Sequence, residues 1–158
     1  MAMKRVYAAT FTGVSVSAAQ DLFALTCGAQ KPVELIRVVL SAEGVTSAAE
    51  LRIQIKRLTA TVTIGSGGST ATPVELSPAE GTSASGTYHV NDTTRMTTTG
   101  TTFVAHSESF QVLNGFDYYP TEDARLLIRD NTGLIVGLEN APGASVTLSG
   151  TLIFAEMT

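Results

Sequence analysis

Apolar and polar residues alternate with a period of two along much of this 158-residue chain. Successive side chains of a β-strand point to opposite faces of a sheet, so each alternating run describes one buried face and one wetter face. This pattern predicts strands from one end of the chain to the other. The apolar members of the clearest runs are Leu51, Ile53 and Ile55; Val62 and Ile64; Leu134, Val136 and Leu138; and Val146, Leu148, Leu152 and Phe154.

Turn residues separate these runs, as at Gly65–Gly68, Asn114-Gly115 and Ala141-Pro142-Gly143. Short strands at regular spacing with almost no helical pattern are typical of sandwiches and jelly rolls. We therefore predict an all-β fold, an antiparallel β-sandwich of the jelly-roll kind. Strands are predicted at Arg5–Thr12, Asp21–Cys27, Val33–Ser41, Leu51–Ile64, Pro73–Ser77, Thr87–Val90, Thr101–Leu113, Ala124–Arg129, Gly133–Glu139 and Ser145–Ala155.

Two of the predicted strands change parity midway. Residues 51–64 carry their apolar side chains at odd numbers in the first half and at even numbers in the second, and the change falls at Lys56-Arg57. Residues 33–41 change in the same way after Leu35. One extra residue in a strand moves all following side chains to the other face, so we predict a β-bulge or a bend at both places.

The segment Gly65–Thr102 differs in composition from the rest of the chain. It is dense in Gly, Ser and Thr and nearly free of large apolar residues, with short strands expected around Val74–Leu76 and Tyr88–Val90. By its length the chain forms one domain, so we predict a single β-sandwich over residues 1–158 with a polar excursion at about 65–102. Long excursions from compact domains tend to be functional, and we expect partner contacts there.

Charge and composition narrow the range of partners. Charged residues make up 15% of the chain, whereas 36 of its 158 residues are Thr or Ser. A neutral, hydroxyl-rich β surface fits a surface that a partner covers, and it equally fits a weakly charged soluble domain. The ten basic residues are scattered and the net charge is −4, so we predict no nucleic-acid partner. No apolar stretch is long enough for a membrane span, and we predict no membrane partner.

The residue types that carry catalysis or bind metals are few. His89 and His106 are the only histidines and Cys27 is the only cysteine, so the spacing of a metal site is missing. The run Gly65–Ser69 leads into a strand, whereas a phosphate loop leads into a helix. Glu122-Asp123, near other acidic residues, fits a solvated turn, with a single structural calcium ion as the alternative. We therefore predict that the protein is not an enzyme and holds no metal or cofactor.

One aromatic cluster stands out. Phe116, Tyr118 and Tyr119 lie between Asn114-Gly115 and Pro120. Such a group can stack on a sugar or anchor a protein interface, because aromatic side chains supply contact area at low entropic cost. It can equally close the end of the sandwich. We take all three aromatic residues as candidate partner contacts and leave both interpretations open.

Several stretches together resemble a group of small all-β virion proteins of tailed bacteriophages and related prophages. The likeness runs nearly the whole length of the chain and is one of strands and turns, with no catalytic signature. The stretches are Ser17-Ala18-Ala19-Gln20-Asp21-Leu22-Phe23, Lys31-Pro32-Val33-Glu34-Leu35, Gly65-Ser66-Gly67-Gly68-Ser69, Asn114-Gly115-Phe116-Asp117-Tyr118, Pro120-Thr121-Glu122, Ala141-Pro142 and Ser149-Gly150-Thr151-Leu152-Ile153-Phe154-Ala155-Glu156.

The resemblance implies a jelly-roll virion component, a capsid cement or decoration protein that sits as a trimer on the phage head. Its partner would be the major capsid protein, and its place the capsid surface of the virion after synthesis in the host bacterial cytoplasm. The N-terminal residues Met1, Lys4 and Arg5 and the excursion are the pieces that we expect to reach neighbouring capsid subunits. Cyclic oligomers match the local symmetry axes of a shell.

The alternative is a jelly-roll recognition module, either a phage fibre tip or a carbohydrate- or receptor-binding domain. It would use Phe116, Tyr118 and Tyr119 as a stacking platform. Fold alone does not separate the two functions, because sandwiches host many.

Overall fold

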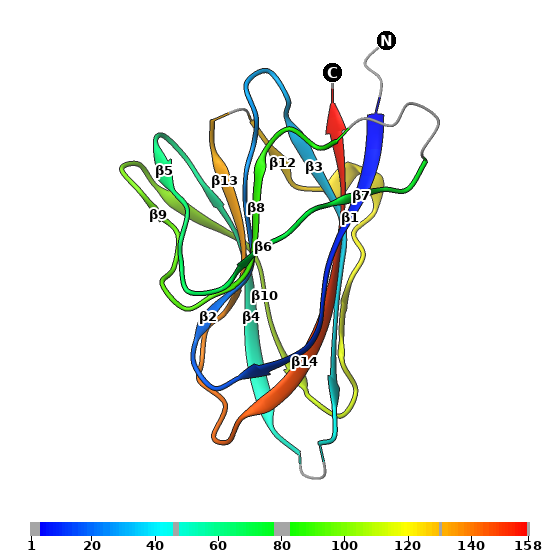
Figure 1. The fold of residues 1–158 in the computed structure, drawn as a ribbon, viewed down its shortest axis with the longest axis vertical. Coiled ribbons are helices and arrows are strands. Elements are labelled where there is room, and N and C mark those ends of the chain that lie inside the picture. Colours follow the sequence, from blue (N-terminus) through cyan, green and yellow to red (C-terminus); the bar gives the residue numbers. More distant parts are fainter. Residues whose placement is uncertain (1–3, 46–47, 78–82, 130, 158) are drawn as a thin grey trace.

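A computed structural model describes residues 4–45, 48–77, 83–129 and 131–157. Two antiparallel sheets pack face to face, so the predicted antiparallel β-sandwich is confirmed (Figure 1). The first and last long strands pair along most of their length, from Lys4 opposite Met157 to Val16 opposite Val146. The N-terminal and C-terminal ends of the described chain therefore lie at the same end of the sandwich (Figure 1).

Sheet A contains the two terminal strands and has the order β11-β3-β14-β1-β7, with β12 also pairing with β3. Its buried face follows the predicted alternation, since every second residue of β14 from Val146 to Phe154 is buried. The bounds of its strands are β1 Lys4–Val16, β3 Val33–Glu43, β7 Val74–Glu75, β11 Phe116–Tyr118, β12 Leu127–Ile128 and β14 Val146–Met157.

Sheet B has the order β10-β4-β13-β2-β8-β6. Its central strand β13 is buried along its whole length, because side chains cover both of its faces. The bounds are β2 Gln20–Thr26, β4 Glu50–Leu58, β6 Ser69–Thr70, β8 Thr87–Asp92, β10 Thr102–Gln111 and β13 Gly133–Leu138.

Two further elements complete the described part. A two-stranded sheet of β5 (Val62–Thr63) and β9 (Thr97–Thr98) lies on the side of sheet B that faces away from sheet A (Figure 1). A single-turn 3-10 helix, η1, spans Glu122–Ala124. The predicted strand Ala124–Arg129 is therefore too long, since only Leu127–Ile128 pairs with β3.

The predicted bulge at Lys56-Arg57 is wrong. β4 pairs with β13 without a break from Ile53 to Leu58, and the chain turns at Ala60, whose φ is 58°. The parity changes because Leu58 faces the outer side of sheet B, where it joins a second, small core. This core consists of Ala24, Leu58, Met96 and Ile135, with Val62 and Ile64 packed against it. The extra residue is in the neighbouring strand β10, where Ala105 is skipped between Val104 and His106.

The second predicted bulge is confirmed. In the pairing of β14 with β3, Ile153 lies opposite Arg37 and Phe154 lies opposite Leu35, so Ile36 is the extra residue. The bulge lets Leu35 and Val38, which differ in parity, both face the core.

Three stacked aromatic rings connect the sheets in the main core. Tyr7 and Phe154 of sheet A stack with ring centroids 5.6 Å apart, and Phe154 and Tyr88 of sheet B with centroids 5.0 Å apart. All three rings are buried. The excursion therefore contributes to the main core through β8.

Candidate functional site

The outer face of sheet A is a neutral surface made largely of hydroxyl groups, which we call the hydroxyl face. Pairing across three strands sets Thr10 beside Thr151 and Thr151 beside Val39, while Ser149 stands beside Ser41. These side chains arise from the alternation itself, since they stand between the apolar residues of β1, β3 and β14. The hydroxyl face consists of Thr10, Thr12, Val39, Ser41, Ser149 and Thr151 and forms a shallow hollow of about 200 Å³.

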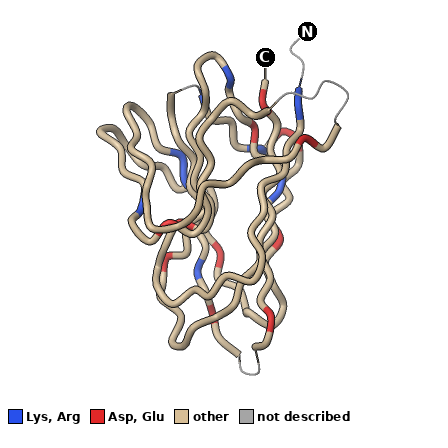
Figure 2. The backbone as a smooth tube through the Cα atoms, viewed as in Figure 1, with Lys and Arg blue, Asp and Glu red and all other residues tan. Residues whose placement is uncertain are grey.

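One ion pair and one exposed ring border the hydroxyl face. Arg37 Nε and Nη2 donate to the two carboxylate oxygens of Asp117 at 3.0 and 2.7 Å. The hydrogen bond from Arg37 lowers the pKa of the Asp117 carboxyl. The Arg37 guanidinium also lies 5.3 Å from the ring centroid of Tyr119, which is 65% exposed. The two charges of this pair neutralise each other, and Glu43, which is exposed and pairs with Thr147, adds one negative charge at the end of the face. Figure 2 shows how sparse charged residues are along the chain.

The three candidate aromatic residues take three different positions. Phe116 is buried and packs on Phe110 with centroids 5.6 Å apart, so its ring belongs to the core and is not free for a partner. Tyr118 is half-buried against His106, at 4.6 Å between centroids. Tyr119 alone is exposed, beside Arg37. The rings do not form a shared stacking platform, because core packing separates Phe116 from Tyr119.

The candidate residues at the N-terminus are held against the sandwich where the structure describes them. Lys4 Nζ lies 2.9 Å from Glu34 Oε2 and 3.8 Å from Glu122 Oε1. Arg5 is half-buried and pairs in the ladder with Glu156. Met1 lies outside the described residues. Lys4 and Arg5 therefore belong to the first strand, and whether they contact a partner stays a prediction.

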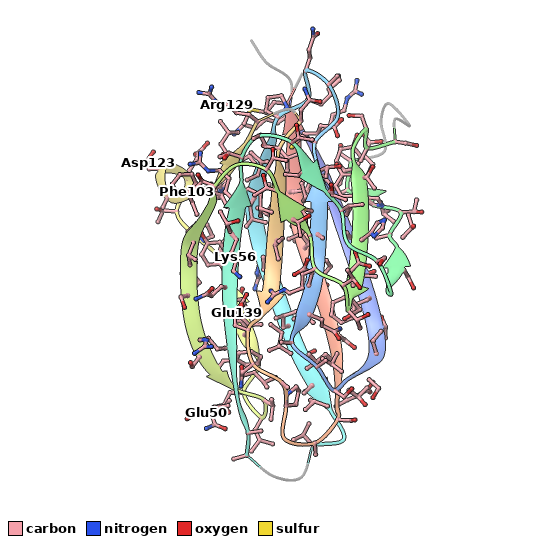
Figure 3. The ribbon with its side chains drawn as sticks, turned by 90° about the vertical axis from the view of Figure 1, so that its left-hand side faces the viewer. Glu50, Lys56, Phe103, Asp123, Arg129 and Glu139 are labelled. Atoms are coloured by element: carbon pink, nitrogen blue, oxygen red, sulfur yellow. The ribbon has the colours of Figure 1, made fainter. Side chains whose placement is uncertain are left out.

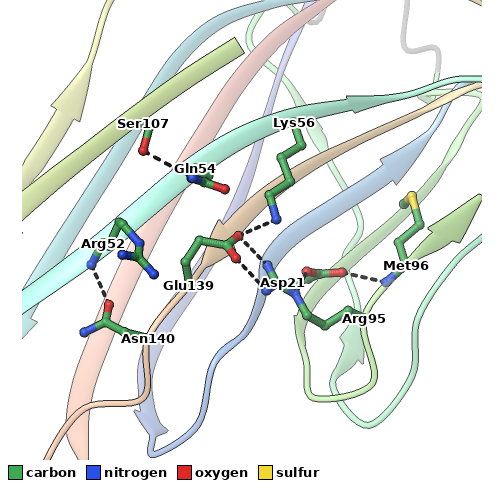
Figure 4. A network of polar contacts seen from close by, with 9 residues as sticks. All are labelled: Asp21, Arg52, Gln54, Lys56, Arg95, Met96, Ser107, Glu139 and Asn140. Carbon is green, nitrogen blue, oxygen red and sulfur yellow. Dashed lines mark hydrogen bonds and ion pairs between the residues drawn. The ribbon is translucent and has the colours of Figure 1, made fainter. Parts of the chain in front are cut away.

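A network of four charged side chains fixes the excursion to sheet B. Arg95, from the excursion, donates through Nε to Asp21 Oδ1 at 2.8 Å and through Nη1 and Nη2 to Glu139 at 3.0 and 2.8 Å (Figure 4). Lys56 Nζ lies 2.7 Å from Glu139 Oε1, and both residues lie near the middle of the sheet (Figure 3). Gly137 makes room for Arg95, because a Cβ there would lie 2.1 Å from Nη2.

The pKa values of the two carboxyl groups in this network are shifted in opposite directions. Asp21 has no exposed side-chain area, and burial raises its pKa despite hydrogen bonds from the Met96 N–H and from Arg95. Glu139 is also partly desolvated, yet hydrogen bonds from Arg95 and Lys56 hold its pKa below the ordinary value. Two cations balance two anions, so the network is a neutral clamp between the excursion and the sheet.

Two segments of the excursion, at its start and near Thr94, lie in close contact. Ser66 and Thr94 exchange backbone hydrogen bonds of 3.0 and 2.9 Å, and a Cβ on Gly65 would lie 1.9 Å from the Thr94 carbonyl oxygen. We expect Gly65→Ala to lower the free energy of unfolding by about 1–3 kcal/mol, because backbone must move to admit the methyl group. Urea unfolding measures this. Gly143→Ala is the matched control, since nothing lies within 4 Å of its Cβ. Equal effects of the two changes would contradict the expectation.

The histidines and the cysteine lie in separate places. His89 Nδ1 is 2.8 Å from Asp92 Oδ2, His106 packs on Tyr118, and Cys27 is buried. Among the described residues, no group of three or more His, Cys, Asp or Glu side chains is arranged to hold a metal ion. Within the same residues, no helix has the length and apolar character to cross a membrane.

Sequence reasoning missed the clamp. Its four charged residues are far apart in the chain and share no local spacing. One signal was present, since Arg95-Met96 places a basic and a large apolar residue within a stretch of threonines. Comparisons with protein-family models, with curated proteins and with solved structures found no match.

Proposed function

We propose that the sandwich is a jelly roll. Eight strands of the two sheets support this, when β12 and the strands of the excursion, β6, β7 and β8, are left out and the others are taken in chain order as β1, β2, β3, β4, β10, β11, β13 and β14. The first pairs with the last, β2 with β13, β3 with β11, and β4 with β10. This nesting is what results when one long hairpin is wrapped into two sheets, the arrangement of a double Greek key.

We further propose that the protein is a structural virion component, a capsid cement or decoration protein of a tailed-phage head. It would bind the major capsid protein at the capsid surface and sit there as a trimer. The observation that carries the proposal is the hydroxyl face with its border at Arg37 and Tyr119. Two features of this surface support the proposal: the hydroxyl face carries no charged side chain, as is usual for interface cores, and Arg37 and Tyr119 at its border are of the types that most often dominate binding energy. The serines of the face do not add to this support, since serine is depleted at interfaces.

The sheet that carries the hydroxyl face suits a protein that binds a partner and catalyses no reaction. The hydroxyl face stands on β1, β14 and β3, whose inward side chains are buried in the main core. A flat face on a rigid sheet loses little conformational freedom when it is covered. Among the described residues, the excursion pairs with sheet A only through β7 at the edge of β1, and none of its residues lines the hydroxyl face, so it leaves this face open.

The test is binding to emptied heads of the phage or prophage that encodes the chain. Light scattering first gives the mass in solution, and a species near three times 16.5 kDa supports a pre-formed trimer. We expect Thr151→Lys to reduce occupancy on the heads by at least about tenfold, because an unpaired charge would be buried in the interface.

The matched control is Thr63→Lys, the same change at an exposed strand position of β5 on the other side of the molecule. It should bind like the unchanged protein, and both variants should keep its circular dichroism spectrum. Absence of the unchanged protein from purified heads, or equal loss of binding in both variants, would overturn the proposal.

A further inference from the structure

A cavity of about 520 Å³ opens at the side of the sandwich away from β10, between β1 of sheet A and the strands β6 and β8 of sheet B. It exists because β7 covers β1 only at Tyr7 and Ala8. Beyond Ala8 no strand of the described chain pairs with this side of β1. The cavity is distinct from the hydroxyl face, although Thr10 and Phe11 line both hollows.

The chemistry of the wall is neutral and rich in hydrogen-bonding groups. None of the fourteen residues that line the cavity is charged. Hydroxyl groups come from both sheets, among them Ser15 and Ser69, while Phe11, Val14 and Val90 supply apolar area. A charged ligand would lose its hydration here without a partner of opposite charge, so the wall selects a neutral one.

Two buried amides are the most specific feature. Gln20 is 4% exposed and Asn91 is 7% exposed, and both line the cavity. Gln20 Nε2 donates to Asn91 Oδ1 at 3.0 Å. Asn91 Nδ2 is buried and finds no hydrogen-bond partner within the described part of the chain. Buried polar groups are nearly always satisfied, so a donor without a partner on a side chain that lines a cavity suggests an acceptor brought by a ligand. Since Nδ2 itself has almost no accessible surface, the Asn91 amide must turn toward the cavity to meet it.

We propose that this cavity is a binding site for a neutral saccharide of one or two rings. Such a ligand presents hydroxyl oxygens that accept from Asn91 and exchange hydrogen bonds with Ser69, and it carries C–H faces that suit Phe11 and Val14. Its volume falls in the usual range for small-ligand sites. A peptide strand added to β1 would be held by backbone groups and would not account for the paired amides.

The experiment titrates ¹⁵N-labelled protein with glucose, galactose, mannose and N-acetylglucosamine, and then with disaccharides of whichever sugar binds. We expect saturable shifts at the amides of Gly68, Ser69 and Asn91. Ionic strength should not change the affinity, because no charge takes part. Absence of saturable shifts with all four sugars would overturn the proposal, as would shifts centred on Tyr119.

Two variants assign the site. Ser69 pairs with the inward-facing Val90, so Ser69→Trp places an indole in the cavity and should weaken binding by at least about tenfold. Ser109→Trp is the matched control, an exposed position on β10 at the other edge of sheet B, and should bind normally. Equal loss in both variants would contradict the assignment.

Asn91→Asp tests the amide itself. It keeps the acceptor for Gln20 and suits the positive φ of 59°, but it removes the free donor. Retained binding in this variant would remove Asn91 from the site. Failure of any of these tests leaves the proposed role on the phage head untouched, since that role depends on Thr151 and the hydroxyl face.

Discussion

Arg95→Met is expected to lower the free energy of unfolding by about 3–5 kcal/mol, the usual cost of leaving a buried charge without its partner. Asp21 would keep only the hydrogen bond from the Met96 N–H, in a place with no exposed side-chain area. Glu139 would keep only Lys56. Methionine fills much of the space of the arginine stem, so the loss measures the charge more than the packing. Urea unfolding at neutral pH gives the value.

The matched control is Arg37→Met, which breaks the exposed pair with Asp117. Exposed pairs contribute about 0–1 kcal/mol, so this variant should stay close to the unchanged protein. A deficit of Arg95→Met no larger than that of Arg37→Met would contradict the role of the clamp.

The loss in free energy of unfolding caused by Arg95→Met should also become smaller as the pH is lowered. Loss of the guanidinium raises the folded-state pKa of Asp21 further, and a group with a raised folded pKa gains stability as the pH falls through that value. Glu139 also makes the difference in stability between the unchanged protein and Arg95→Met smaller in acid. Its lowered pKa stabilises the unchanged protein above the ordinary value of 4.5, and this advantage is lost as the pH falls. A deficit that grows on acidification would contradict the assignment of charges.

The β-sandwich could be predicted because the alternation that marks each strand is contained in neighbouring residues of the sequence. Alternation along β14 and β4 marks the buried face, and the parity change after Leu35 marks the bulge at Ile36. The same reasoning failed at Lys56-Arg57. A change of parity shows that the other face has become apolar, but it does not distinguish a bulge in the strand from a second core on the other face. The strand keeps its alternation there, and Leu58 is apolar on the outer face because a second core lies against that face, under β5 and β9. The local sequence does not show that this core exists.

The candidate contacts were harder to predict, since exposure depends on distant segments. Phe116 and Tyr119 are three residues apart and both aromatic, yet Phe116 packs on Phe110 in the core, whereas Tyr119 is exposed with the Arg37 guanidinium over its ring. The hydroxyl groups of β1 and β14 were visible in the composition. Their gathering on one face required the pairing of Thr10 with Thr151, which sequence spacing does not give.

Phe154→Ala is expected to lower the free energy of unfolding by about 3–5 kcal/mol, through lost burial and the cavity left behind. The ring is fully buried between Tyr7 and Tyr88 and is the main apolar contact in which β14 of sheet A meets Tyr88 of β8. The Tyr88 hydroxyl also donates to Glu156 Oε2 of β14, at 3.5 Å. Amide exchange should therefore speed up in Thr87–Asp92 as well as in β14. Phe103→Ala is the matched control, because Phe103 is 46% exposed on the edge strand β10. Protection of β8 that survives in Phe154→Ala would contradict this expectation and would mean that pairing with β2 and the polar contacts hold β8 without the aromatic stack.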